Sequence, residues 1–312
     1  MDRIQWHIEP TSKCILECPL CDRTWFYEKF KRRLNNEINV DHLINFLKGT
    51  SPNILLCGNN GDPIYHSQFH ELCRGLKGIG SKIEINTNGS GKKKEWWTDL
   101  CSVLSPEDDL ITFSIDGLED TNHIYRINAK WESIMEAIET VHENKINTTW
   151  KFIVFKHNQH QIKDAEQFSR KLGFKNFKLI KSDRWWHRQD LMPTEEFVDS
   201  SYKHQAQVTK GTDDKSSTIR QRCMSVLNGE PDTELYIDSD GDFYPCCKTG
   251  LYAFRYKNIF SPKDRKFNIR DNTVEQILNH PDVKGFFDST KSYDTAFSCC
   301  KIYCRKKEEN LV

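Results

Sequence analysis

The sequence predicts an α/β protein in which a partial parallel barrel of six strand–helix units is followed by a small α+β domain. One observation supports the barrel: apolar segments of strand length alternate with helical patterns up to about residue 183. Strands that are joined by helices usually run parallel in one sheet, so this alternation predicts a parallel barrel. A second observation supports the small domain: six of the 12 cysteines lie after residue 222, where the alternation of strands and helices has ended.

The first half of the barrel begins with a strand at residues 4–11, which runs into a loop that contains three cysteines. Residues 40–49 have apolar residues at helical spacing. A buried strand with a glycine-rich turn follows at 53–63, and glycines end the next helix at 67–80. Residues 82–90 alternate with period two, which predicts a strand.

The second half repeats the same pattern. The predicted strands lie at 109–117, 148–158 and 175–183, and the predicted helices at 93–105, 130–145 and 161–173. The helix at 130–145 is the clearest amphipathic segment of the chain. No clear helix follows the sixth strand, so the sixth unit is incomplete.

We expect a domain boundary near residue 190, with a core at 1–190 and a second domain at 191–312. The second domain opens with a polar, roughly helical segment that links it to the core. Residues 233–247 predict a hairpin, because Asp-Ser-Asp-Gly separates two apolar runs. Residues 274–287 are helical with an interruption at Pro281.

Composition limits the partners of this protein. Charged residues make up 29% of the chain, and 45 basic residues balance 45 acidic ones, which argues against nucleic acid or a membrane surface as a partner. No apolar run has transmembrane length, and the N-terminal residues lack the pattern of a signal peptide. We therefore expect a cytoplasmic protein whose clustered cysteines bind metal.

Cys14, Cys18 and Cys21 form a C-x3-C-x2-C motif after the first strand. Three thiolates are one short of the four that usually complete an iron–sulfur or zinc site. Either a [4Fe–4S] cluster with one open iron or a catalytic zinc ion fits this number. Active sites of parallel barrels form at the carboxyl ends of the strands, which is where this loop lies.

In this position the motif resembles that of the radical S-adenosylmethionine (radical SAM) superfamily, and the resemblance covers the whole chain. It implies that Cys14, Cys18 and Cys21 hold a [4Fe–4S] cluster whose fourth iron binds S-adenosylmethionine. Reductive cleavage of that cofactor yields a 5′-deoxyadenosyl radical, which removes a hydrogen atom from the substrate. The electron would come from a reductant such as flavodoxin or ferredoxin.

The turn after the second strand resembles the Gly-Gly-Glu-Pro turn of the family, whose backbone receives the methionine amino group. Gly58, Asn60, Gly61 and Asp62 occupy this turn. The two glycines allow a close approach of the chain. Asp62 replaces the family's glutamate, which leaves the role of this carboxylate open.

The cysteine loop and the later strand ends carry further cofactor contacts that the resemblance implies. These residues are Leu20, Asn88, Ser114, Arg126, Val154 and Ile180. The leucine, the valine and the isoleucine would contact the adenine. Arg126 would bind the carboxylate of S-adenosylmethionine through two parallel hydrogen bonds. Each feature alone is an ordinary turn or an unremarkable side chain, so the prediction rests on their order along successive strands.

The late cysteines resemble the twitch or SPASM extension of the superfamily, which binds auxiliary iron–sulfur clusters. We select four ligands for one auxiliary [4Fe–4S] cluster: Cys223, Cys246, Cys300 and Cys304. Cys247 and Cys299 are the alternatives, because two adjacent cysteines can hardly bind the same cluster. A structural zinc site, or free thiols, remains the competing interpretation.

Four polar residues near the strand ends are candidates for contact with the substrate: Glu9, Tyr27, Asp183 and Arg184. Glu9 is equally able to cap its own strand.

A radical SAM enzyme that oxidises or otherwise modifies a small molecule is the favoured function. Modification of a ribosomally made peptide or another macromolecule is the alternative. Because the first predicted strand starts at residue 4, we expect no N-terminal peptide-binding domain, which weakens that alternative. A non-catalytic iron–sulfur or zinc module that binds nucleic acid is the third hypothesis, and it leaves the glycine turn, Ser114 and Arg126 without a purpose.

Overall fold

The computed structural model describes residues 4–50, 52–185, 188–212, 234–251, 260 and 265–304. Its sheet has eight strands in the order β6-β5-β4-β3-β2-β1-β7-β8. The strands are β1 Gln5–Ile8, β2 Asn53–Leu56, β3 Lys82–Thr87, β4 Leu110–Ser114, β5 Asn147–Ile153, β6 Asn176–Ile180, β7 Glu234–Ile237 and β8 Phe243–Tyr244. Every pair from β6 to β7 is parallel, which confirms the predicted partial barrel and its six strands.

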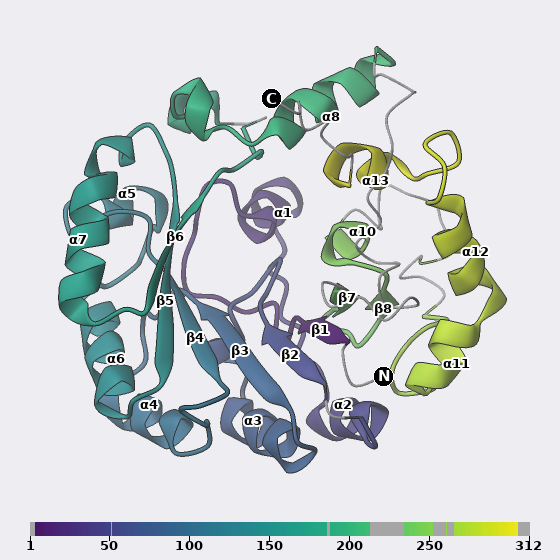
Figure 1. Ribbon diagram of the computed structural model, residues 1–312, viewed down its shortest axis with the longest axis horizontal. Helices are drawn as coiled ribbons and strands as arrows, with labels where there is room; N and C mark the ends of the chain where they lie inside the picture. Colours follow the sequence, from purple (N-terminus) through teal and green to yellow (C-terminus); the bar gives the residue numbers. More distant parts are fainter. Residues whose placement is uncertain are drawn as a thin grey trace, which may run out of the picture.

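Helices cover the outer side of the curved sheet, as Figure 1 shows for α2, α3, α4, α6 and α7. The helices of this half are α1 Asp22–Phe30, α2 Val40–Leu47, α3 Phe69–Gly78, α4 Lys94–Cys101, α5 Asn122–Tyr125, α6 Trp131–Glu143 and α7 Ile162–Leu172. Short 3-10 helices lie at η1 Pro63–Tyr65, η2 Gln159–Gln161, η3 Gln189–Leu191 and η4 Glu195–Phe197. In the described ranges, no helix has the length and apolar character that a membrane span requires.

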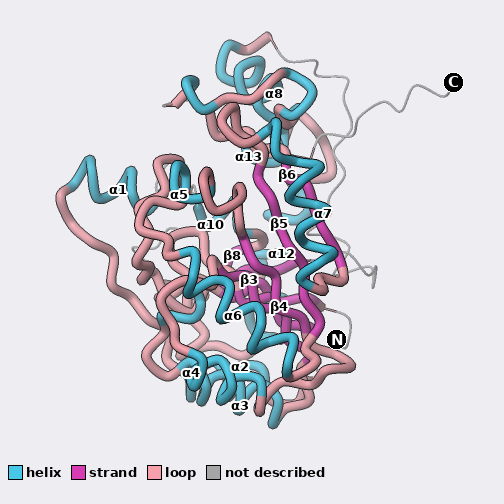
Figure 2. The backbone as a smooth tube through the Cα atoms, turned by 90° about the vertical axis from the view of Figure 1, so that its left-hand side faces the viewer, coloured by secondary structure: helices cyan, strands magenta, loops and turns pink. Residues whose placement is uncertain are grey.

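Sequence patterns did not predict α1, which lies apart from α2, α3 and α4 (Figure 2). Arg23 is its one buried residue, so the helix has no apolar stripe that a periodicity could reveal. It begins directly after Cys21 and therefore forms the outer end of the cysteine loop.

The second half of the chain continues the same sheet. Its elements besides β7 and β8 are α8 Ser200–Lys210, α10 Cys247–Leu251, α11 Val274–Asn279, α12 Pro281–Ser289 and α13 Ser298–Tyr303. The predicted hairpin is confirmed as β7 and β8, which pair antiparallel. Strand β7 also pairs in parallel with β1, which local patterns could not indicate. The break at Pro281 is confirmed, because this proline starts α12. The boundary near residue 190 stays a prediction.

The two faces of β1 separate the core from the barrel interior. The ring of Trp6 lies 5.5 Å from that of Phe46 in α2, so Trp6 faces the helices. Neighbouring side chains of a strand point to opposite faces, which turns His7 and Glu9 towards the interior. The interior of the barrel near β1 is therefore polar, whereas its outer side is apolar.

Trp150 of β5 is a central residue of the hydrophobic core, and its substitution tests how much the core contributes to stability. Its side chain is fully buried, packs against Phe168, Phe174 and Phe177, and donates a 2.8 Å hydrogen bond to the Ile115 carbonyl. Replacing Trp150 by alanine should destabilise the fold by about 3–5 kcal/mol, because it leaves a cavity and an unpaired carbonyl. Thermal unfolding followed by circular dichroism measures the loss.

The matched control is Phe30→Ala, since Phe30 is 53% exposed on α1. It should change the stability by about 0.5 kcal/mol or less. An equal loss in both variants would contradict this assignment of the core.

Candidate functional site

The cysteine loop connects β1 to α1 and is held from two sides. The Asp62 amide donates to the Lys13 carbonyl at 2.9 Å, which joins the loop to the turn after β2. The Glu17 amide donates to the Ile127 carbonyl at 3.1 Å, which joins it to the segment after α5. These bonds bring the loop over the carboxyl ends of the strands.

An apolar group of side chains surrounds the three cysteines. Cys14, Cys18 and Cys21 pack in one cluster that includes Leu16, Leu20, Tyr125, Ile153, Phe155, Trp185 and Leu191. Trp185 is fully buried there and donates its indole N–H to the Ser182 carbonyl at 2.8 Å. This tryptophan therefore packs beside the cysteine loop.

The sulfur atoms have partners that suit metal ligands. The Leu16 amide donates to Cys14 Sγ at 3.4 Å, and the Asn88 side-chain amide donates to it at 3.7 Å. Burial raises the pKa of Cys14 to about 12 and that of Cys18 to about 11, while the guanidinium of Arg126 works against the shift at Cys18. A buried thiol of this kind loses its proton when a metal takes its place. Three thiolates with N–H donors in an apolar shell fit an iron–sulfur cluster.

Glu9 organises the glycine turn after β2. Its side chain is fully buried, and Oε1 accepts hydrogen bonds from the amides of Asn60, at 2.7 Å, and Gly61, at 3.0 Å. The Tyr236 hydroxyl donates to Oε2. Burial raises the pKa of Glu9, and these hydrogen bonds oppose the shift. Glu9 therefore holds the turn after β2 and not its own strand β1, and a contact with the substrate stays a prediction.

Gly61 is required where the turn meets the cysteine loop. A Cβ atom at Gly61 would lie 1.9 Å from the Thr11 carbonyl oxygen, which no side chain tolerates. Gly58 is equally restricted, because its Cβ would lie 2.3 Å from the Gly61 carbonyl oxygen.

Asp62 connects the turn after β2 to the end of β3. This buried carboxylate accepts from the Thr87 hydroxyl at 2.9 Å, the Asn88 amide at 2.6 Å and the Ile64 amide at 3.3 Å. Its other partner is the Asn88 side-chain amide at 2.5 Å. Asp62 thereby orients Asn88 towards Cys14. The aspartate that departs from the family pattern thus has a defined role in this chain.

Arg126 is held by Asp116, a partner that sequence reasoning missed. Arg126 Nε donates to Asp116 Oδ2 at 2.6 Å, and Asp116 Oδ1 accepts from the Ile153 amide at 2.7 Å. Desolvation of the buried guanidinium is outweighed by Asp116, so the pKa of Arg126 is raised. The available signal was Asp116 itself, two residues after Ser114 at the end of β4.

The apolar contacts predicted for adenine lie on two different faces. Leu20 is half-buried within the cysteine-loop cluster. Val154 is fully buried in the main core, whereas its neighbour Ile153 packs against the cysteine loop. The Val154 amide donates to the carbonyl of half-buried Ile180 at 3.1 Å. The alternation of β5 therefore favours Ile153 over Val154 as the side chain that faces the loop.

A cavity of about 360 Å³ adjoins the cysteine loop. Asp183 and Arg184 line it, and Arg184 Nη1 donates to Asp22 Oδ2 at 3.2 Å. Sequence reasoning missed Glu28 of α1, which also lines this cavity. Tyr27 is 39% exposed, is not among the lining residues, and lies under the guanidinium of Arg33.

A second cavity, of about 470 Å³, is lined by late cysteines in and next to α10 and α13. The five that line it are Cys246, Cys247, Cys299, Cys300 and Cys304. Cys246 Sγ lies 3.1 Å from the Thr249 hydroxyl and accepts from the Thr249 amide at 3.4 Å. Three of the predicted cluster ligands, Cys246, Cys300 and Cys304, therefore line one cavity together with the two alternative ligands. Cys223 lies outside the described residues.

A partial barrel with three cysteines after its first strand, and with a second cysteine-lined cavity, is the arrangement of a protein with two metal centres. Residues 8–168, more than half of the chain, match the Radical SAM superfamily. The chain belongs to this superfamily. Residues 229–305 match SPASM, an iron–sulfur cluster-binding domain. The two matches support a catalytic cluster that works with S-adenosylmethionine and an auxiliary cluster.

Two curated relatives share 23% identity with the chain. One is the cysteine-type anaerobic sulfatase-maturating enzyme of Clostridium novyi (strain NT), matched over 75% of this chain and 66% of that protein. The other is the tungsten-containing aldehyde ferredoxin oxidoreductase cofactor-modifying protein of Pyrococcus furiosus, matched over 54% of this chain and 48% of that protein. The chain therefore spans about two thirds and about half of their lengths.

Two solved structures share the fold at low sequence identity. Native anSMEcpe with bound AdoMet is 14% identical, with a TM-score of 0.59 over 92% of this chain and 83% of that one. Streptococcus suis SuiB is 13% identical, with a TM-score of 0.63 over 91% of this chain and 67% of that one. At this identity the likeness establishes the fold alone.

The two-centre assignment predicts the iron content. Anaerobically reconstituted protein should hold about eight irons per chain, and the double variant Cys246→Ala/Cys304→Ala about four, because it loses one cubane. Iron and sulfide analysis measures this, and some cleavage of S-adenosylmethionine should remain. The control is the Cys101→Ala variant. Cys101 lies in the main core, so this variant should retain about eight irons per chain. Full iron in the double variant would refute the ligand assignment.

The position of Glu9 predicts a binding defect. Glu9→Gln replaces one acceptor by a donor, so amides of the glycine turn or Tyr236 lose a partner, at a cost of about 1–3 kcal/mol. Equilibrium dialysis should then show roughly 5- to 150-fold weaker binding of S-adenosylmethionine with iron unchanged. Exposed Glu119→Gln is the control. Unchanged affinity with reduced turnover would instead indicate a catalytic Glu9.

Proposed function

We propose that this chain modifies an amino-acid side chain of a ribosomally made peptide by radical chemistry. Support comes from its relatives: one is a sulfatase-maturating enzyme, and two similar structures contain peptides, namely anSMEcpe with the Cp18Cys peptide and SuiB with the precursor peptide SuiA. Small-molecule oxidation, which the sequence favoured, has less support. The cofactor-modifying relative keeps it as the second candidate.

The cavity beside the cysteine loop is the observation that carries this proposal. It has room for a side chain, and its lining, here called its rim, carries both charges: the acidic side chains are Glu17, Asp22, Glu28 and Asp183, and the basic ones are Arg184 and Arg188. A peptide backbone offers donors and acceptors together, so a rim of mixed charge suits it. Cys21 lines the same cavity, so a side chain bound there would lie next to the cysteine loop.

We assign the following roles in cofactor binding to residues of this chain. When bound, the reduced cluster supplies the electron that cleaves S-adenosylmethionine. Arg126, oriented by Asp116 through Nε, can offer its terminal nitrogens to the carboxylate of the cofactor. The turn that Glu9 holds would receive the amino group, and the apolar shell around the cysteines, including fully buried Trp185, would exclude water. An external reductant such as flavodoxin or ferredoxin remains a prediction.

The experiment is an anaerobic turnover with dithionite, S-adenosylmethionine and two substrate sets. One set contains synthetic peptides encoded near the gene, and the other a fractionated metabolite extract. We expect 5′-deoxyadenosine together with a mass change in a peptide, because hydrogen abstraction precedes the modification. Mass spectrometry measures both products, and the Cys18→Ala variant is the control without a complete catalytic site.

Modification of a metabolite and of no peptide would support the second candidate. Absence of S-adenosylmethionine cleavage in protein that holds about eight irons would refute both.

A further inference from the structure

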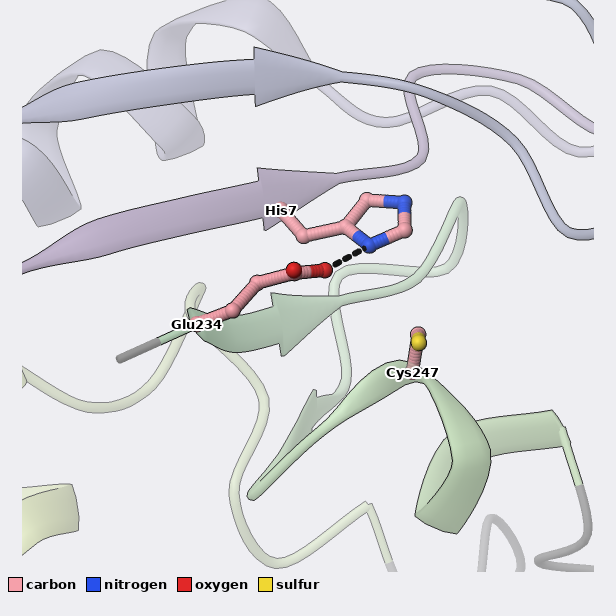
Figure 3. Close-up of side chains that lie close together, drawn as sticks. All are labelled: His7, Glu234 and Cys247. Carbon is pink, nitrogen blue, oxygen red and sulfur yellow. Dashed lines mark hydrogen bonds and ion pairs between the residues drawn. The ribbon is translucent and has the colours of Figure 1, made fainter. Parts of the chain in front are cut away.

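His7, Glu234 and Cys247 form a third group of metal-binding side chains, separate from the cysteine loop (Figure 3). One ligand atom from each residue lies within 4.8 Å of the others. In the part of the chain that the structure describes, no other set of His, Cys, Asp and Glu gathers this tightly. None of the three is among the four auxiliary-cluster ligands selected from the sequence, although Cys247 is an alternative to Cys246.

The sheet brings two of these residues together. In the parallel pairing of β1 and β7, Gln5 lies opposite Glu234. His7 follows Gln5 by two positions, so it is on the same face of the sheet as Glu234 and diagonal to it. Cys247 arrives from the start of α10, directly after the β7–β8 hairpin, and Figure 3 shows its side chain directed towards the pair.

The hydrogen bonds of His7 determine which nitrogen can bind a cation. The Cys57 carbonyl lies 2.8 Å from Nε2 and can only accept, so Nε2 carries a proton. Nδ1 contacts the Glu234 carboxylate, which is also an acceptor. With Nε2 protonated, Nδ1 is the ring nitrogen that can bind a cation, either a proton held against Glu234 or a metal ion that takes the place of that proton. A histidine whose other ring nitrogen donates to a backbone carbonyl is the usual arrangement in metal sites.

We propose that His7, Glu234 and Cys247 bind one Zn²⁺ ion that is distinct from both iron–sulfur clusters. Nitrogen, oxygen and thiolate donors together suit zinc, and three protein ligands leave a fourth position open. His7 is 5% exposed, so its side of the site is largely shielded from water.

Glu234 and Cys247 also line the 470 Å³ cavity, so the open position would face that space. A water molecule, or an oxygen or sulfur atom of a ligand, can occupy it.

This assignment separates the adjacent cysteines. Cys246 bonds to Thr249 within its own turn and belongs with the cysteines of α13, whereas Cys247 joins His7 and Glu234. Neighbouring residues then serve two centres, which removes the difficulty of binding both to one cubane.

The test uses reconstituted protein that holds about eight irons, so that zinc cannot fill vacant cluster sites. After addition of one equivalent of ZnCl₂ and desalting, elemental analysis should find one zinc per chain. Absorption at the zinc K-edge should show one sulfur at about 2.3 Å and nitrogen or oxygen at about 2.0–2.2 Å. Cys247→Ser should lose the sulfur signal, and His7→Ala should weaken zinc binding at least tenfold, both with iron unchanged.

Glu234→Gln keeps the size of the side chain and removes its charge, so it tests the site even if His7→Ala fails to fold. It should also weaken zinc binding at least tenfold, whereas the exposed control Glu119→Gln should not. The proposal is overturned if the iron-loaded wild type retains no zinc, or if all three variants retain it. Loss of iron from Cys247→Ser would overturn it too, since Cys247 would then be a cluster ligand.

Discussion

The pairing of β1 on both of its edges is the constraint on which the rest of this structure depends. Strand β1 pairs with β2 on one side and with β7 on the other, both in parallel. Its carboxyl end leads into the cysteine loop, and β7 leads through a hairpin to the second group of cysteines. One short strand therefore determines where both metal-binding regions lie. Tyr236 of β7 also donates a hydrogen bond to Glu9, which holds the glycine turn after β2.

Three buried carboxylates, Glu9, Asp62 and Asp116, follow β1, β2 and β4. Each accepts backbone N–H groups from a neighbouring loop or strand, and burial raises the pKa of each. Burying a carboxylate is costly unless its oxygens are hydrogen-bonded, so these loops are held in one arrangement. Loops held in this way keep the groups at the strand ends in fixed positions, which orients any molecule that binds there.

The interior side of β1 joins the catalytic barrel to the auxiliary domain. His7 points into the barrel, yet its partners Glu234 and Cys247 line the cysteine-rich cavity. His7 therefore contacts the lining of that cavity from the strand that leads into the cysteine loop.

The sequence by itself determined the six strands, the cysteine spacing and the order of the cofactor-binding turns, because each is encoded within a few neighbouring residues. Only the tertiary structure decided that β7 joins β1, that Asp116 holds Arg126 and that Glu9 supports the glycine turn. It also decided that Ile153 rather than Val154 faces the cysteine loop. The contact of His7 with Glu234 spans 227 residues, and no local pattern reports it. Contacts between residues so far apart in the sequence depend on how the whole chain packs. The periodicity of apolar residues indicates only whether a segment is a helix or a strand.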